Sequence, residues 1–131
     1  MKVALGIGCD RGTPVNTIAQ AVDAALQQAG AQASDVGAVA SIDLKADESG
    51  LLEFAATHGW QIRFYPAAEL SAVVVPNPSE VVRKYTGTPS VAEAAALLAA
   101  ETDMGHLLVE KYKLRGPDGR NATISIARIT Q

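Results

Sequence analysis

A glycine-rich segment near the N-terminus constrains the fold of this chain more than any other feature. It reads GIGCDRGTP over residues 6–14, an apolar run at 3–7 leads into it, and an amphipathic stretch at 15–29 follows. This order predicts a buried strand, a tight loop and a helix, the repeating unit of α/β sheets. Because the loop presents N–H groups at the positive end of a helix, it favours an anionic ligand. The alternative is a turn in which the glycines serve backbone geometry alone.

The loop differs from two common phosphate-binding motifs. The dinucleotide fingerprint GxGxxG needs its third glycine one residue before Gly12. The P-loop needs a lysine immediately before Thr13, where this chain has Gly12. A nucleotide-binding α/β domain is therefore disfavoured, although a thermal-shift screen with nucleotides would test it.

The remaining pattern predicts a three-layer α/β/α sandwich around a mixed, mainly parallel five-stranded sheet. An apolar run indicates a buried strand at 36–42, a third strand is predicted at 60–65, and partial alternation indicates an antiparallel hairpin of 107–114 and 122–129. Helical spacing and breakers predict helices at 15–29, 50–58, 78–86 and 91–101, with one helical turn at 67–71. Residues 43–49 are expected to be a charged loop, and 72–75 a connection interrupted by prolines.

Polar residues are expected to cap these helices. Thr13 precedes Pro14, which suits the first position of a helix, so Thr13 is predicted as the cap. Asn77 is the expected cap of helix 78–86. Ser90 and Glu93 have the spacing of a capping box, in which each side chain binds a backbone N–H of the other residue.

Composition and charge exclude several classes of protein. The 131 residues fit one domain, 1–131, with an ordinary apolar fraction of 48%. A net charge of −3 and an aromatic fraction of 5% disfavour nucleic-acid binding. The apolar runs fall short of the ~20 residues that a membrane span needs, and the first run is too short for a signal peptide. Since Cys9 is the only cysteine, an internal disulfide is excluded and a cytoplasmic location is predicted.

Four ordered segments resemble one known family. They are GIGC with RGT at 6–9 and 11–13, SIDLKADESGL at 41–51, PSEVV at 78–82, and GTPSVAEAAAL at 87–97. Together they resemble the CobE family and the C-terminal domain of CbiG, from cobalamin biosynthesis, over nearly the whole chain. The resemblance implies a role with a precorrin, a tetrapyrrole rimmed by acetate and propionate carboxylates. CbiG-type proteins open a lactone ring on a cobalt-precorrin and release acetaldehyde, but they carry a further N-terminal domain. CobE-like proteins stand alone and belong to the aerobic pathway.

Ligands of open α/β sheets gather at the carboxyl ends of the parallel strands. In this chain those ends carry residues 8–13, 43–49 and the segment after residue 65. We expect Arg11, Lys45 and the N–H groups near Gly12 to bind ligand carboxylates, whereas the alternative is that both cations are solvated loop charges. A second, weaker anion site is expected at residues 86–88, before a helix N-terminus. The predicted ligand-binding residues are Gly8, Cys9, Asp10, Arg11, Gly12, Thr13, Asp43, Lys45, Thr88 and Ser90.

Catalytic candidates are less defined. Asp43, Asp47 and Glu48 could supply a general acid and base for a lactone, or together hold Mg²⁺. The simpler interpretation is a charged loop in which Asp43 or Ser49 caps the next helix, so neither a metal site nor a cofactor is predicted. Cys9 lies beside a helix N-terminus, where a thiolate is favoured, but both histidines are expected elsewhere, and a buried structural thiol is preferred.

Two functions therefore remain in competition. The preferred one is a CobE-like protein that binds or hands over a precorrin or corrinoid intermediate of the aerobic pathway, with other pathway enzymes as partners. The alternative is a precorrin lactone hydrolase, for which acetaldehyde release would decide. A monomer or small homo-oligomer is expected, and neither nucleic acid nor a membrane is an expected partner.

Overall fold

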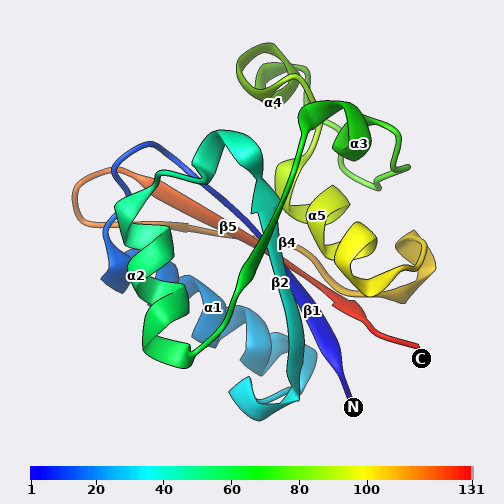
Figure 1. The fold of residues 1–131 in the computed structure, drawn as a ribbon, viewed down its shortest axis with the longest axis horizontal. Coiled ribbons are helices and arrows are strands. Elements are labelled where there is room, and N and C mark those ends of the chain that lie inside the picture. Colours follow the sequence, from blue (N-terminus) through cyan, green and yellow to red (C-terminus); the bar gives the residue numbers. More distant parts are fainter. Residues whose placement is uncertain (131) are drawn as a thin grey trace.

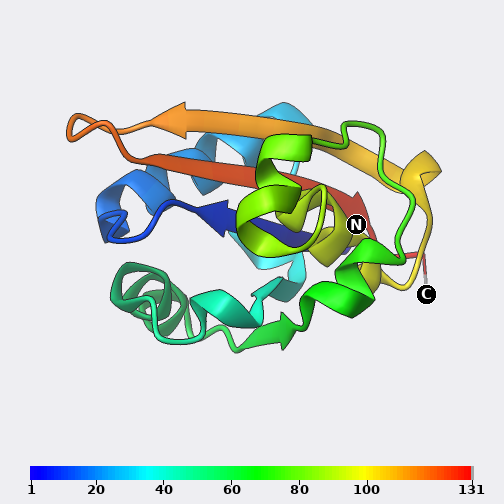
Figure 2. The same ribbon diagram turned by 90° about the horizontal axis from the view of Figure 1, so that it is seen from above.

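A mixed five-stranded sheet forms the centre of the computed structural model, which describes residues 1–130. The strands lie in the order β3-β2-β1-β5-β4. Their bounds are Val3–Cys9 for β1, Val36–Ile42 for β2, Ile62–Tyr65 for β3, Leu107–Arg115 for β4 and Asn121–Arg128 for β5. β1 pairs in parallel with β2 and β2 with β3, whereas β5 lies antiparallel between β1 and β4. Four strands thus share one direction, and Figure 2 shows the order from orange β4 through red β5 and blue β1 to green β3.

Helices cover both faces of this sheet, which confirms the predicted three-layer α/β fold. α1 (Val15–Ala29) and α2 (Ser49–His58) lie on one face. α5 (Val91–Ala100) covers the other, with α3 (Ala67–Ser71) and α4 (Glu80–Thr86) beside its N-terminal end. Figure 1 shows the two helical layers on opposite sides of the strands. Gly30 and Gly59 end α1 and α2 in the left-handed conformation.

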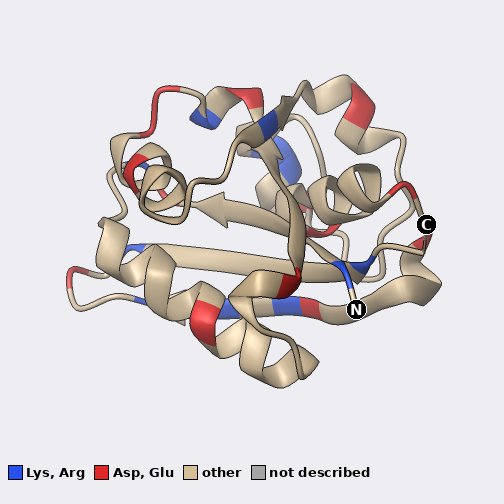
Figure 3. Cartoon of the chain, turned by 60° about the horizontal axis from the view of Figure 1, so that its bottom comes forward, with Lys and Arg blue, Asp and Glu red and all other residues tan. Residues whose placement is uncertain are grey.

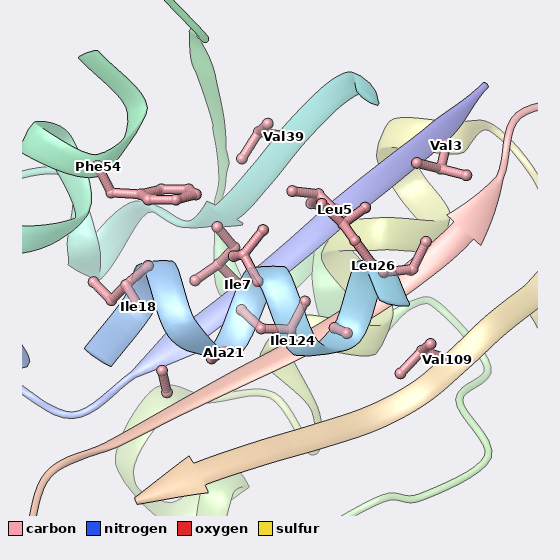
Figure 4. Close-up of a cluster of buried hydrophobic side chains, with 14 of the residues drawn as sticks. Val3, Leu5, Ile7, Ile18, Ala21, Leu26, Val39, Phe54, Val109 and Ile124 are labelled. Atoms are coloured by element: carbon pink, nitrogen blue, oxygen red, sulfur yellow. The ribbon is translucent and has the colours of Figure 1, made fainter. Parts of the chain in front are cut away.

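The two faces of β1 differ in side-chain size, and this difference sets how closely each helix packs. Leu5 and Ile7 join Ile18, Phe54 and Ile124 in the larger core beneath α1 and α2, as Figure 4 shows. The opposite face of β1 carries small residues against the alanines of α5. A Cβ on Gly6 would overlap the backbone of Ala92 and Ala96, so this glycine allows α5 to lie directly on the strand.

Several predicted caps are wrong because the side chains have tertiary partners. Thr13 Oγ1 donates to the carbonyls of Asp10 and Asn121, and Pro14 is the N-cap residue of α1. Ser79, not Asn77, caps α4 by accepting from the Val82 N–H. Glu48 is the N-cap residue of α2, so neither Asp43 nor Ser49 has this role.

The predicted capping box at the start of α5 is also absent. Ser90 makes no side-chain cap bond, and its hydroxyl instead donates to Glu93 Oε1 at 2.9 Å. The expected loop at 43–49 begins with a 3₁₀ turn, Asp43–Lys45. The connection 72–75 contains no strand, as predicted.

Candidate functional site

The carboxyl ends of the parallel strands lie at one edge of the sheet, and most predicted site residues follow them. The loop 10–14 leaves β1, the segment 43–48 leaves β2, and α3 leaves β3. The N-terminus of α5 reaches the same edge, because a Cβ on Gly8 would lie 3.7 Å from Val91. Parallel strand ends are where open α/β sheets bind ligands, so this edge stays the predicted position of the site.

Glu48 links the first two of these segments. Its Oε1 accepts from the Gly12 N–H at 2.8 Å, and its Oε2 lies 3.0 Å from Arg11 Nη1. The Glu48 side chain is only 4% exposed. A backbone N–H of the glycine loop and a guanidinium therefore already hold a carboxylate, which is the group that the sequence predicted for this loop. The carboxylate belongs to the chain itself, and nothing in the sequence pattern indicated that.

Arg11 makes two further contacts. Its Nη1 donates to Asp47 Oδ1 at 2.8 Å, and its Nη2 donates to the Leu44 carbonyl at 3.0 Å. The hydrogen bond and charge of Arg11 lower the pKa of the Asp47 carboxyl. Asp47 is thereby held ionised and is a poor general acid near neutral pH. Arg11 itself remains 60% exposed, so it can also reach a ligand.

The hairpin of β4 and β5 supports the loop from the other side. Asp10 Oδ2 accepts from the backbone N–H and the side-chain amide of Asn121, at 2.8 and 3.1 Å. Arg120 Nε donates to the Arg11 carbonyl at 3.0 Å. Sequence reasoning missed both partners, because they lie more than 100 residues away and their approach depends on the position of β5 beside β1.

Cys9 lies at the end of β1 with its thiol protonated. Burial raises its pKa to about 11, and the nearby Lys45 offsets this only in part. A nucleophilic thiolate would require the opposite shift. The structure therefore favours the structural interpretation of Cys9.

Thr88 and Ser90 occupy a second, buried polar cluster beside the first turn of α5. Glu93 is fully buried, accepts from Ser90 Oγ, and also accepts from Asn77 Nδ2 at 2.6 Å. Thr88 Oγ1 is buried and has no hydrogen-bond partner within residues 1–130. The hydrogen bonds of the described residues do not connect this cluster with the loop 10–14, so it is separate from the Arg11–Glu48 contact.

The acidic residues of the segment 43–48 diverge. Asp47 and Glu48 both contact Arg11, whereas Asp43 is exposed and lies outside that contact. In the part of the chain that the structure describes, no three His, Cys, Asp or Glu side chains gather as a metal site. An open cavity of about 480 Å³ is lined by the segment 12–15 and by Ser49, Gly50 and Glu53 of α2.

Comparison with known proteins identifies the family. A family model described as cobalamin synthesis G C-terminus matches residues 3–127. The chain belongs to this family. It is 40% identical over 111 residues to protein CobE from Sinorhizobium sp, which covers 83% of this chain and 71% of that protein. The predicted resemblance is thereby confirmed, and the chain is a cobalamin biosynthesis protein similar to CobE.

Two solved structures of cobalamin biosynthesis proteins share the fold. The crystal structure of CobE, a protein from the cobalamin pathway, superposes with a TM-score of 0.83 at 30% identity, covering 99% of this chain and 95% of that one. The cobalamin biosynthesis protein chiG from Agrobacterium tumefaciens gives a TM-score of 0.66 at 29% identity, covering 98% and 99%.

One relative has a named activity. The cobalt-precorrin-5A hydrolase of Priestia megaterium is 37% identical over 127 residues, which is 97% of this chain but 32% of the hydrolase. The chain thus spans about a third of that enzyme's length. Within residues 1–130, none of the helices is long and apolar enough to cross a membrane.

Proposed function

We propose that this chain binds a precorrin or corrinoid intermediate of the aerobic cobalamin pathway at the carboxyl edge of its sheet and hands it over unchanged. The observation that carries the proposal is the carboxylate-binding arrangement of the Gly12 N–H and the Arg11 guanidinium. A precorrin presents acetate and propionate carboxylates around its rim, which are the groups that such donors recognise. Lys45, in the segment after β2, adds a second cation on the same edge.

Exposed apolar side chains near this edge fit the flat face of the macrocycle. Val81 and Tyr85 of α4 are 68% and 75% exposed, and Leu44 is 49% exposed. No residue of α4 is buried. Arg83 and Lys84 add positive charge to its last turn. A tetrapyrrole site needs both an apolar surface and cationic groups. Figure 3 shows acidic and basic residues interspersed over the chain, unlike the single basic face of a nucleic-acid binder.

Transfer to a following enzyme would make another cobalamin-pathway protein a partner, with this chain acting as a monomer or small homo-oligomer. The second candidate function is hydrolysis of a precorrin lactone, favoured by the similarity to the Priestia megaterium hydrolase. The chemistry of the site supports the carrier instead. Asp47 is held ionised by Arg11, and the raised pKa of Cys9 disfavours a nucleophilic thiolate.

The deciding experiment is a titration with late precorrins, including hydrogenobyrinic acid, followed by absorbance and mass spectrometry. Saturable binding with unchanged ligand mass is the expected result. Release of acetaldehyde would instead support the hydrolase and return Asp43, Asp47 and Glu48 to consideration. Absence of binding by every precorrin tested would refute the carrier function.

A further inference from the structure

We propose that Glu48 is an internal occupant of the carboxylate site, and that a ligand carboxylate binds by exchange with it. This inference rests on the proposed function, because it concerns the same site and specifies how its ligand enters. The exchange would make Glu48 a competitor of the ligand and a determinant of affinity.

The contacts of Glu48 are those of a bound ligand. The Gly12 N–H donates to Oε1 at 2.8 Å and Arg11 Nη1 lies 3.0 Å from Oε2. Glu48 is the N-cap residue of α2, yet its side chain makes no cap bond to its own helix. A polar side chain at this position ordinarily accepts from the next turn of the same helix. Glu48 instead serves the loop before α1, a separate element 36 residues earlier in the chain.

The site leaves one oxygen of the Glu48 carboxylate without a hydrogen bond. Oε2 is buried and lacks a hydrogen bond within the described residues, although it is ion-paired with Arg11. Arg11 also binds Asp47 and the Leu44 carbonyl, so its charge is shared. A carboxylate with an unsatisfied oxygen gains hydration on leaving, which reduces the cost of its displacement.

Space for the exchange is adjacent. The open cavity of about 480 Å³ reaches Gly12, the donor to Glu48, and Ser49, the residue that follows Glu48. An acetate or propionate arm would approach Gly12 from the cavity and meet Arg11, which does not line the cavity but is 60% exposed, as the Glu48 side chain turns outward. The same donors would be satisfied before and after the exchange.

The first test fills the site without a corrinoid. Glu48→Ala should leave a vacant carboxylate position, so acetate or propionate should raise its Tm saturably above that in chloride of equal ionic strength. Wild type should show no such difference, and the double variant E48A/R11A should lose the effect. If E48A does not fold in chloride, recovery of folding in propionate is the equivalent result. Absence of any carboxylate-specific effect on E48A would overturn the proposal and leave Glu48 as a structural link.

The second test measures competition. Glu48→Gln keeps the size of the side chain but removes its charge, so hydrogenobyrinic acid should bind about two- to fivefold more tightly than to wild type. Glu53 lines the entry cavity and is unsuitable as a control, so Asp23→Asn, which removes an exposed charge of α1 outside the cavity, controls for long-range electrostatics. Weaker binding by E48Q than by D23N would make Glu48 a support for the ligand and refute exchange. If E48A takes up acetate but wild type and E48Q bind no corrinoid, the exchange site stands and the proposed function fails.

Discussion

Gly6 should be the least replaceable residue of β1, and the structure allows the cost of Gly6→Ala to be worked out. A Cβ at this position would overlap the Ala92 carbonyl oxygen and lie 2.7 Å from Ala96 N and 2.9 Å from Ala92 C. Real Cβ contacts essentially never fall under 3.0 Å. The obstructing atoms are backbone, so no side chain can rotate away, and α5 would have to retreat from the sheet by roughly 1 Å.

Two opposing effects decide the sign of the change. Replacing a strand glycine by alanine ordinarily stabilises by roughly 0.5–1 kcal/mol through backbone entropy. Overpacking a core ordinarily costs about 1–3 kcal/mol, and here it displaces a helix whose buried alanines share one core with Ala4 and Ala40. Because the overlap is with backbone, the overpacking cost should lie near its upper end, so we expect Gly6→Ala to lower the free energy of unfolding by about 2 kcal/mol net, with a fall in Tm of roughly 8 °C.

Gly8→Ala is the matched control, because it lies on the same strand and its Cβ would meet only Val91 side-chain carbons at 3.7 Å, an ordinary contact. Urea denaturation followed by circular dichroism measures both variants with unchanged m-values. Gly8→Ala should be neutral or stabilising by up to about 1 kcal/mol, because it keeps the entropic gain without the overlap. If Gly6→Ala were equally neutral, the close packing of α5 on β1 would be refuted.

Three further predictions concern the edge of the sheet. Arg11→Ala should weaken tetrapyrrole binding in the absorbance titration, and undiminished affinity of an R11A/K45A variant would contradict the site. Because the pKa of the Cys9 thiol is about 11, its reaction with iodoacetamide should be slow at pH 8 and accelerate toward pH 11. The unfolded thiol ionises first, near pH 9.0, so wild type should lose stability relative to C9A between pH 9 and pH 11. Arg11 lowers the pKa of Asp47, so the ionised Asp47 stabilises the fold above about pH 3.8, and this stability is lost as the pH falls. Wild type should therefore lose more stability than D47N on acid titration. Parallel curves would contradict the Arg11–Asp47 contact.

The elements could be predicted from the sequence because their periodicity and breakers are local. The helix 15–29 is marked by its apolar face and by Gly30, and the structure has the same bounds. The N-caps of α1 and α5 could not be predicted, because tertiary contacts compete with the local cap bond. Thr13 donates to the Asn121 carbonyl, and Glu93, which accepts from Ser90, is also held by Asn77. Local preference is a weak guide wherever a polar side chain is buried by another element.

The candidate site shows the same division. That Arg11 lies beside the segment after β2 follows from parallel strand topology alone. That Asn121 holds the loop follows from β5 pairing with β1, which no local pattern encodes. The occupation of the Gly12 N–H by Glu48 was equally out of reach, because acidic residues in a loop give no indication of which donor they contact.

Gly50 lies where the start of α2 packs on the segment before α1, two residues after Glu48. Its replacement therefore tests the contact between Glu48 and the Gly12 N–H. Alanine is the better helix former by about 1 kcal/mol, so Gly50→Ala in α2 would stabilise a free helix. Here its Cβ would overlap the Thr13 carbonyl oxygen and lie 3.3 Å from Val15 N, both backbone atoms of the segment that begins α1.

The overlap should prevail over helix propensity, since neither partner is a flexible side chain. The start of α2 would be pushed away from the glycine loop, and the Glu48 contact two residues earlier would lengthen. We therefore expect Gly50→Ala to be less stable than wild type and to show a carboxylate-specific rise in Tm with acetate over chloride, as a milder form of E48A. Gly6→Ala, destabilised on the opposite face of the sheet, should show no acetate effect. If both variants respond alike to acetate, the effect would reflect general loosening of the fold instead of release of Glu48 from its site.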